Sequence, residues 1–422
     1  MVESPDRNRE NEDSTYPRIG GHAATVANKG IFLIGGGRHT NGVYELSKEV
    51  HLIDHDTNQC KTIESAAIQR LLQLVRPTAI TRRIHNKEEI IVFGGTNLQR
   101  VRTNTMIAIG MDKYDTVSLK LIKSMNEVPG RSSHTAHYIK EEDAMVVLFG
   151  LSSVEGESLK LVEMFKFTEQ RWVDMTPPIT SPSSDIFANS EVSLNNDDSS
   201  SSSNTPCYRV HHVSIQYLDT TIIVFGGLCP SNDPSNRDGG KFLNDVWAFD
   251  VSRRSWQSIE TSGQKPTPRS SAAAVMYDDK MFIIGGRSPS LDEEPLSRAE
   301  YIYFLDLQTN VWSCIHEPYI FKVYKGVKIF NHVAEVMNDH IYIHGGFVLS
   351  GKQQNHLIRY PLLTLTQKFQ RNLLVSNHFY DIAIYFDDAS SSFRPNPDLV
   401  RPKRDFDDNN DDTSHLKLKR LF

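Results

Sequence analysis

The chain has 422 residues, of which 39% are hydrophobic and 23% are charged, with 24 Gly, 19 Pro, 20 Phe and 15 Tyr. This length allows two or three ordinary domains or one large repeat architecture, and the glycine, proline and aromatic content favours short strands over long helices. The formal net charge of -6 excludes the bulk positive charge on which most binders of nucleic acid and anionic membranes depend.

The N-terminus is charged where a secretory signal would be apolar, and no later segment approaches about eighteen consecutive apolar residues. We therefore expect a soluble, cytoplasmic protein with no membrane insertion and no nucleic-acid partner. The four cysteines, Cys60, Cys207, Cys229 and Cys314, lie far apart in the sequence and show no CxxC spacing. We expect reduced, mostly structural thiols, with neither a disulfide framework nor a zinc site.

A short phrase recurs six times along the chain, namely a β-branched or aromatic run that ends in paired glycines. The copies are Ile31–Gly36, Ile90–Gly95, Met145–Gly150, Ile222–Gly227, Met281–Gly286 and Ile341–Gly346. In the third copy we take Gly150 as the first glycine, so that Leu151 replaces the second. The spacing of the copies is that of a supersecondary unit and is too short for a domain.

Further runs surround each copy of the phrase. Upstream lies a short alternating run that opens with His or Ala, and downstream lie an aromatic run and then a run led by Trp, as in Asp250 to Trp256 and Asp306 to Trp312. Four short strands in each unit predict an antiparallel sheet. Because one such sheet buries little surface alone, six of them predict a six-bladed propeller.

Two units depart from the pattern. The second has no Trp, and the sixth has no clear Asp–Trp pair, so we expect both blades to be degenerate. A strand-like run at 378–386 could complete the last blade or reinforce its closure against the first, and the sequence leaves both options open.

The pattern resembles the kelch-repeat family, whose units carry Pro-Arg near the first strand, Gly-Gly after the second, an aromatic residue in the third and Trp in the fourth. The resemblance covers about 17–375 and implies an all-β fold, a six-bladed kelch β-propeller of four-stranded antiparallel blades. The predicted organisation is a disordered N-terminus at 1–16, a propeller at 17–386 and a disordered, charged tail at 387–422. The repeats are expected at about 17–63, 73–123, 129–175, 207–259, 266–315 and 329–375, with an insertion at 176–206.

The insertion is polar and Ser-rich, so it should be a disordered loop. It is either a passive spacer or a phosphorylation platform at Thr176 and Ser181, each of which precedes Pro. In the tail, two basic clusters at 401–404 and 417–420 have a spacing like that of a bipartite nuclear-import signal. Nuclear location is therefore the alternative to the cytoplasm, and a solvated tail with no targeting role remains open.

Some kelch-type propellers are enzymes, including copper radical oxidases and sugar epimerases, so catalysis has to be weighed. The chain shows no recognisable ligand cluster and no phosphate-binding loop. His22, His134, His211 and His332 recur once in a blade at the same strand start, where a repeated structural hydrogen bond explains them better than metal binding. We predict no catalytic residues, no metal and no cofactor.

In kelch proteins the residues just before the innermost strand line one mouth of the central channel. The residues at those positions here are Arg18, Arg76, Arg131, Arg209 and Arg269, with Lys328 nearby in the sixth unit. Converging guanidinium groups would bind carboxylates. Alternatively, each arginine pairs with a neighbouring Asp or with a backbone carbonyl, and the sequence leaves both options open.

The resulting hypothesis is a non-enzymatic interaction module or scaffold that binds a partner protein or peptide, with acidic character, on the propeller rim. One alternative is a substrate receptor of a ubiquitin ligase, although we recognise no BTB or F-box segment before the repeats. A kelch-type enzyme is the second alternative. The sequence does not indicate an oligomeric state.

Overall fold

The computed structural model describes residues 16–40, 43–84, 87–111, 117–152, 161–177, 205–231, 239–289, 301–316, 329–348 and 353–362. These residues belong to one unit, which spans Met1–Leu362. The predictions of a disordered insertion and a disordered tail, of a strand at 378–386 and of an import signal lie outside the described residues. In the described part of the chain, no helix has the length and apolar character of a membrane span.

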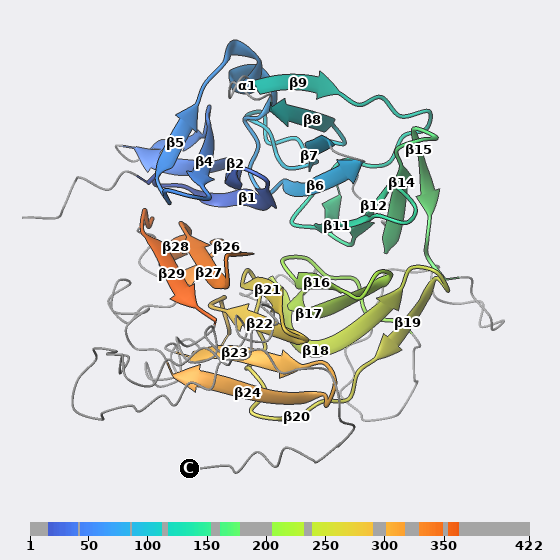
Figure 1. The fold of residues 1–422 in the computed structure, drawn as a ribbon. Helices are drawn as coiled ribbons and strands as arrows, with labels where there is room; N and C mark the ends of the chain where they lie inside the picture. The colour runs from blue at the N-terminus through green and yellow to red at the C-terminus, as the bar shows by residue number, and fades with distance from the viewer. Residues whose placement is uncertain are drawn as a thin grey trace, which may run out of the picture. The chain divides into compact units, whose positions relative to one another are not determined.

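Six sheets follow one another along the chain and are numbered here as blades 1 to 6 (Figure 1). Blade 1 consists of β1 (Gly20–Ala27), β2 (Gly30–Thr40), β4 (Val50–Asp54) and β5 (Cys60–Ile63), with β3 (Val43–Leu46) paired to β2. Blade 2 consists of β6 (Thr78–Ile84), β7 (Lys87–Phe93), β8 (Met106–Met111) and β9 (Val117–Leu121). Blade 3 consists of β11 (Thr135–Ile139), β12 (Ala144–Leu148), β14 (Val162–Lys166) and β15 (Arg171–Asp174).

The second half of the ring repeats this plan. Blade 4 consists of β16 (Val213–Tyr217), β17 (Thr221–Pro230), β18 (Gly240–Asp250) and β19 (Ser255–Ser258). Blade 5 consists of β21 (Ala273–Tyr277), β22 (Lys280–Ile284), β23 (Tyr301–Asp306) and β24 (Val311–His316), with β20 (Ser262–Gly263) parallel to β24. Blade 6 has β26 (Val333–Met337), β27 (His340–His344) and β29 (Leu357–Pro361) among the described residues. There are also two short pairs, β10 (Arg131–Ser132) with β13 (Leu151–Ser152) and β25 (Ile329–Phe330) with β28 (Phe347–Val348). In each pair one strand precedes the inner strand of its blade and the other follows the second strand, in blades 3 and 6.

The innermost strands of the six blades contact one another in chain order, and the ring closes because β26 of the last blade contacts β1 of the first. The predicted all-β, six-bladed propeller is therefore confirmed. Blade 2, which the sequence predicts to be degenerate, has four strands like its neighbours. The domain limits proposed from the sequence stay a prediction.

The hydrophobic core is divided into six clusters, and each cluster fills the seam between two adjacent blades. In three seams a Trp of the fourth strand packs against a Phe of the preceding blade. The ring-centroid distances are 4.9 Å for Trp172 and Phe93, 5.5 Å for Trp256 and Phe149, and 5.2 Å for Trp312 and Phe225. The tryptophans therefore stabilise the contacts between blades, as aromatic pairs of this spacing do.

A short helix, α1 (Ala66–Leu71), explains how the seam next to blade 2 is filled without a Trp. Ser65 caps the helix, since its hydroxyl accepts a hydrogen bond from the Ile68 backbone N–H at 3.1 Å. Ile68 and Leu72 are fully buried in the seam between blades 1 and 2. The aliphatic side chains of this helical segment thus take the place of the missing indole, which the sequence pattern did not predict.

A ring of six backbone hydrogen bonds joins the blades around the channel. Each bond runs from the N–H of a residue at or just before the start of an inner strand to the carbonyl of its counterpart in the preceding blade, at 2.7–3.3 Å. The six residues are Gly21, Arg76, Ser133, His211, Ser271 and Asn331, and all have φ between +54° and +66°. The last bond, from Gly21 to Asn331, links blade 1 back to blade 6.

A second ring lies beside the first. The N–H of one glycine in each blade donates to a carbonyl of the next blade at 2.7–3.3 Å, from Gly36, Gly95, Gly150, Gly227, Gly286 and Gly346 to Leu74, Arg131, Arg209, Arg269, Ile329 and Ile19. Gly150 is therefore the second glycine of its pair, and the assignment of Leu151 to that position is wrong. Phe149 replaces the first glycine and keeps its left-handed backbone, with φ +52°.

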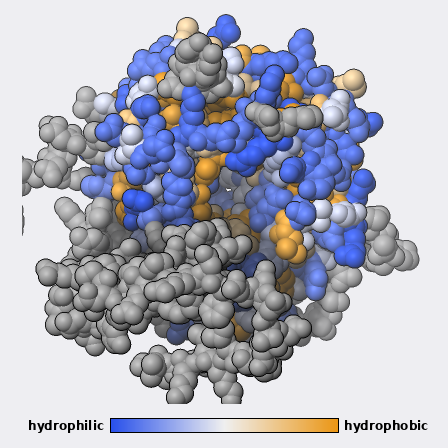
Figure 2. Space-filling model, in the orientation of Figure 1, coloured by the Kyte–Doolittle hydropathy of each residue, from blue (hydrophilic) through white to orange (hydrophobic). Residues whose placement is uncertain are grey.

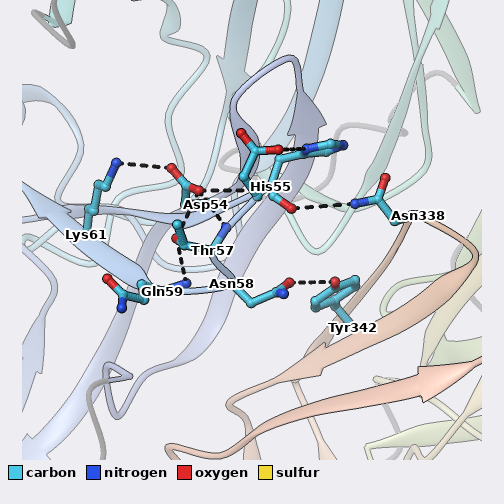
Figure 3. A network of polar contacts seen from close by, with 9 residues as sticks. Asp54, His55, Thr57, Asn58, Gln59, Lys61, Asn338 and Tyr342 are labelled. Atoms are coloured by element: carbon cyan, nitrogen blue, oxygen red, sulfur yellow. Dashed lines mark hydrogen bonds and ion pairs between the residues drawn. The ribbon is translucent and has the colours of Figure 1, made fainter.

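The contact between blades 6 and 1 also includes side chains (Figure 3). The Tyr342 hydroxyl of β27 donates to Asn58 Oδ1 at 2.7 Å, and Asn338 Nδ2 donates to the His55 carbonyl at 3.5 Å. The turn that carries Asn58 is ordered by Asp54, whose Oδ1 accepts from the Thr57 N–H at 3.0 Å. Hydrogen bonds from this turn and from Lys61 hold the Asp54 pKa well below its usual range.

Buried histidines predict how stability depends on pH. Burial lowers the pKa of His332 to about 4 and that of His344 to about 3, and it also lowers the pKa of His22, His134 and His212 well below the usual value. Because the unfolded chain binds these protons first, the free energy of unfolding should fall as pH drops below about 6.5. Each histidine that stays neutral in the folded protein should lower the free energy of unfolding by about 2 kcal/mol at pH 5. Urea denaturation at pH 7.5 and 5 would measure this, and equal stability at the two values would contradict it.

A second prediction concerns the seams. Trp312 is 1% exposed, so Trp312→Ala should lower the free energy of unfolding by about 3–5 kcal/mol through lost contacts between blades 4 and 5. Met125→Ala serves as the control, because Met125 is 80% exposed and its truncation should change stability by less than about 0.5 kcal/mol. Chemical denaturation of both variants makes the comparison, and equal midpoints would reject the seam assignment.

Candidate functional site

The inner strands surround a central channel with a cavity of about 570 Å³, and a narrower mouth of about 150 Å³ lies at one end. The mouth is lined by the ring residues and the residue that follows each of them, among them Arg76, Ser133, His211, Ser271 and Asn331. Figure 2 shows a largely hydrophilic surface with hydrophobic residues around a central hollow. We call the end of the propeller with the glycine pairs and this mouth the glycine rim.

The second hydrogen-bond ring reveals which of the predicted arginines are structurally equivalent. The residues whose carbonyls accept from the glycines are Ile19, Leu74, Arg131, Arg209, Arg269 and Ile329. Arginine thus occupies this position in blades 3, 4 and 5 only. Arg18 lies one residue before it and Arg76 two residues after it, so the sequence alignment that placed five arginines at one position is wrong. Lys328 lies outside the described residues.

The three equivalent arginines are buried and point back into their own blades. Arg131 pairs with Glu163 of β14, and its Nη1 donates to the Phe149 carbonyl at 3.3 Å. Arg209 forms a bidentate pair with Asp245 of β18, with N–O distances of 2.8 and 2.9 Å. Bidentate pairs of this kind fix the orientation of both side chains.

Arg269 follows the same plan, with backbone carbonyls among its partners. Its Nη1 donates to the Gly285 carbonyl at 2.9 Å, and its Nε donates to the Thr267 carbonyl at 3.1 Å. In all three blades Nη1 thereby satisfies the carbonyl at the turn that follows the second strand. These contacts favour the alternative that the sequence left open, in which the arginines are structural ties. A role of all five arginines in partner binding stays a prediction.

Arg76 differs from these ties in every respect. Its backbone belongs to the ring around the mouth, and its side chain is exposed to solvent. In the described part of the chain, its guanidinium makes no hydrogen bond or ion pair. Desolvation by the surrounding protein lowers the Arg76 pKa, Tyr44 opposes this shift, and the positive charge of Arg102 adds to it. A cation in this position would be stabilised by an anion.

The residues around Arg76 were not identified from the sequence. Arg102 lies in the loop between β7 and β8, where its Nη1 donates to the Ser152 carbonyl of blade 3 at 2.8 Å. Leu98 and Val101 of the same loop are 57% and 52% exposed, and Tyr44 of β3 is 41% exposed. The sequence indicates these residues only by their position, because Tyr44 and the loop from Leu98 to Arg102 each follow a glycine pair. We call Tyr44, Arg76, Leu98, Val101 and Arg102 the rim patch.

Arg18 is exposed at the glycine rim, next to blade 6. Its charge contributes, after burial, to lowering the pKa of His356. Arg18 and Arg76 are thus the two predicted site residues that remain accessible to solvent.

The recurring histidines contact neighbouring blades. His134 Nε2 lies 2.9 Å from the Thr78 hydroxyl of blade 2, and His212 Nε2 lies 2.9 Å from the Thr135 hydroxyl of blade 3. In blade 4 the equivalent residue is therefore His212, whereas the sequence alignment placed His211 there. His211 belongs to the backbone ring. Among the described residues, no three His, Cys, Asp or Glu side chains gather in an arrangement suited to a metal ion.

Comparison with known proteins places the repeats in context. A family model described as the KLHDC2/KLHL20/DRC7 Kelch-repeats domain matches residues 185–346. Host cell factor 2 of Homo sapiens is 29% identical over 153 residues, which cover 34% of this chain and 18% of that protein. Host cell factor of Drosophila melanogaster is 26% identical over 120 residues, which cover 26% of this chain and 7% of that protein.

The chain is also similar to a segment of a dynein chain. The dynein alpha chain of the flagellar outer arm of Chlamydomonas reinhardtii is 34% identical over 83 residues, which cover 20% of this chain and 2% of that protein. The similarity to each of these relatives thus spans less than a fifth of the relative's own length.

The free energy of unfolding distinguishes the buried arginines from the exposed Arg76. Arg131→Ala should lower the free energy of unfolding by about 3–5 kcal/mol, because it leaves the buried Glu163 carboxylate without its partner. Arg76→Ala should change it by less than about 0.5 kcal/mol, because no described residue loses a hydrogen bond or ion pair to the guanidinium. Urea denaturation of the two variants makes the comparison. Equal losses would mean that Arg76 is also a structural tie.

Proposed function

Because this chain belongs to the kelch-repeat family, we propose that it is a non-enzymatic protein-interaction module whose glycine rim docks an acidic segment of a partner protein. Function on such scaffolds usually lies in loops that a rigid framework presents. The two hydrogen-bond rings join all six blades at the glycine rim. A partner that binds there contacts loops whose first residues are fixed by these backbone hydrogen bonds.

The observation that carries the proposal is the guanidinium of Arg76 at the channel mouth, which has no hydrogen-bond or ion-pair partner among the residues that the structure describes. The cost of holding a cation beside Arg102 is relieved when a carboxylate binds between them. Tyr44 provides an aromatic surface and a hydroxyl close to the same guanidinium. An Asp, a Glu or a chain-terminal carboxylate supplies the matching charge.

Apolar contacts define the rest of the recognition element. Leu98 and Val101 are exposed on either side of Arg100, which is also exposed. Aliphatic side chains beside cations favour a ligand in which an acidic residue lies next to an apolar one. The proposed ligand is therefore a short segment with at least one carboxylate and one aliphatic or aromatic anchor.

The proposal can be tested with displayed peptides and the purified chain. A library of random peptides should be enriched in sequences that combine Asp or Glu with an apolar neighbour. For a synthetic peptide from that set, Arg76→Glu should weaken binding by at least about tenfold, or about 1.4 kcal/mol, as measured by fluorescence anisotropy. Binding should also weaken as salt is raised.

The matched control is Arg171→Glu, which makes the same charge reversal at an exposed residue of β15 on the opposite end of the propeller. This variant should bind the peptide as the unaltered chain does. Enrichment of basic peptides, or equal affinity of the Arg76→Glu and Arg171→Glu variants, would reject the rim patch as the docking site.

A further inference from the structure

Two cysteines that are far apart in the sequence meet at the glycine rim of blade 4. Cys207 lies in the segment that leads into β16, and Cys229 lies near the end of β17. Val210 and Leu228 exchange two backbone hydrogen bonds of 2.9 and 2.8 Å, which hold the two segments side by side. This pairing brings the Cys207 and Cys229 thiols close enough for each to change the acidity of the other. All four cysteines are free thiols in the structure, and Cys207 and Cys229 differ from the other two in having each other as neighbours.

The pair differs in exposure and in its charged neighbours. Cys207 is exposed and Cys229 is half-buried. Arg209 Nη2 lies 3.6 Å from Cys207 Sγ, while the same guanidinium is fixed by Asp245 at 2.8 and 2.9 Å and donates from Nε to the Cys207 carbonyl at 3.2 Å. The cation is thus held rigidly beside one sulfur atom.

These contacts give the two thiols different acidities. The hydrogen bond from Cys229 lowers the pKa of Cys207, and the charge of Arg209 adds to this, whereas burial and the Asp245 carboxylate oppose it. The same hydrogen bond and burial raise the pKa of Cys229, which Arg209 and Lys241 only partly offset. Cys207 is therefore the thiolate of the pair, and Cys229 keeps its proton.

The other two cysteines have the opposite character. Burial raises the pKa of Cys60 to about 11, and it also raises the pKa of Cys314. The Cys314 thiol donates to Gln264 Oε1 at 2.9 Å. Both are protonated at neutral pH and serve as internal standards for reactivity.

We propose that Cys207 and Cys229 form a reversible redox site, in which Cys207 is the nucleophile towards a hydroperoxide and Cys229 is the resolving thiol. The Cys207 thiolate attacks one peroxide oxygen, so that an S–O bond forms, the O–O bond breaks, sulfur is oxidised and water or an alcohol leaves. Cys229 then attacks the Cys207 sulfenic acid, so that the S–S bond forms, the S–O bond breaks and the Cys229 proton leaves with hydroxide as water. A thiol reductant such as dithiothreitol restores the two thiols.

The site requires neither the docking role of the rim patch nor a ligand in the channel. It uses a structural feature already described, because Arg209 is one of the buried ties. Its resulting disulfide would join the segment before β16 to the end of β17 within one blade.

The first experiment compares the four thiols in the full chain. After reduction and removal of the reductant, iodoacetamide at neutral pH should alkylate Cys207 at least about tenfold faster than Cys60 or Cys314, as followed by peptide mass spectrometry. Hydrogen peroxide should then give a bridged peptide pair containing Cys207 and Cys229, lighter by two hydrogen atoms and restored by dithiothreitol.

Two variants assign the roles. Cys229→Ser should still be oxidised at Cys207 but should stop at the sulfenic acid, which dimedone traps, whereas Cys207→Ser should lose both the trapped adduct and the bridge. Cys60→Ser is the matched control and should form the bridge as the unaltered chain does. Equal alkylation rates for the thiols, or oxidation of Cys207 to the sulfinic acid without any bridged peptide, would overturn the proposal.

Discussion

The two rings of backbone hydrogen bonds around the channel mouth are the constraint on which the rest of the structure depends. Each bond joins two blades, and both rings close from blade 6 to blade 1, so the spacing of all six sheets is coupled at this end. The ring that runs through Gly21, Arg76, Ser133, His211, Ser271 and Asn331, called the inner ring here, requires a left-handed backbone at all six positions. Five of these residues are not glycine. Such a conformation costs about 1–2 kcal/mol for a residue with a Cβ and persists only where surrounding packing enforces it. The six hydrophobic seams supply that packing.

The rings also decide what each arginine at the glycine rim can do. A residue whose carbonyl accepts from a glycine of the preceding blade has its side chain inside its own blade, as Arg131, Arg209 and Arg269 do. A residue two positions later belongs to the inner ring and borders the mouth, as Arg76 does. The same side chain is thus a tie at one position and an accessible cation at the other, because the backbone directs it to a different environment.

This separation accounts for two kinds of chemistry at one end of the molecule. Around Arg76 the described residues provide positive charge and exposed apolar side chains without a compensating carboxylate, which favours an acidic ligand. Around Arg209 the charge is already matched by Asp245, and what remains of its field acts on the Cys207 sulfur 3.6 Å away. Both features depend on loops or lead-in segments that start from the rings, so their geometry is set by the scaffold and not by the loops alone.

The sequence alone determined the fold class, because glycine pairs, strand periodicity and tryptophans at fixed spacing are local signals that each unit repeats. It also singled out the rim arginines, although it could not distinguish ties from accessible cations. Arg18 lies one residue before, and Arg76 two residues after, the position that Arg131 occupies in its blade. This position is defined by a backbone hydrogen bond from a glycine of the preceding blade, which the sequence does not show. Helix α1 was missed because its role, filling a seam that lacks an indole, exists only between blades. The pairing of Cys207 with Cys229 was likewise decided by tertiary structure, since only the folding of blade 4 brings two distant segments together.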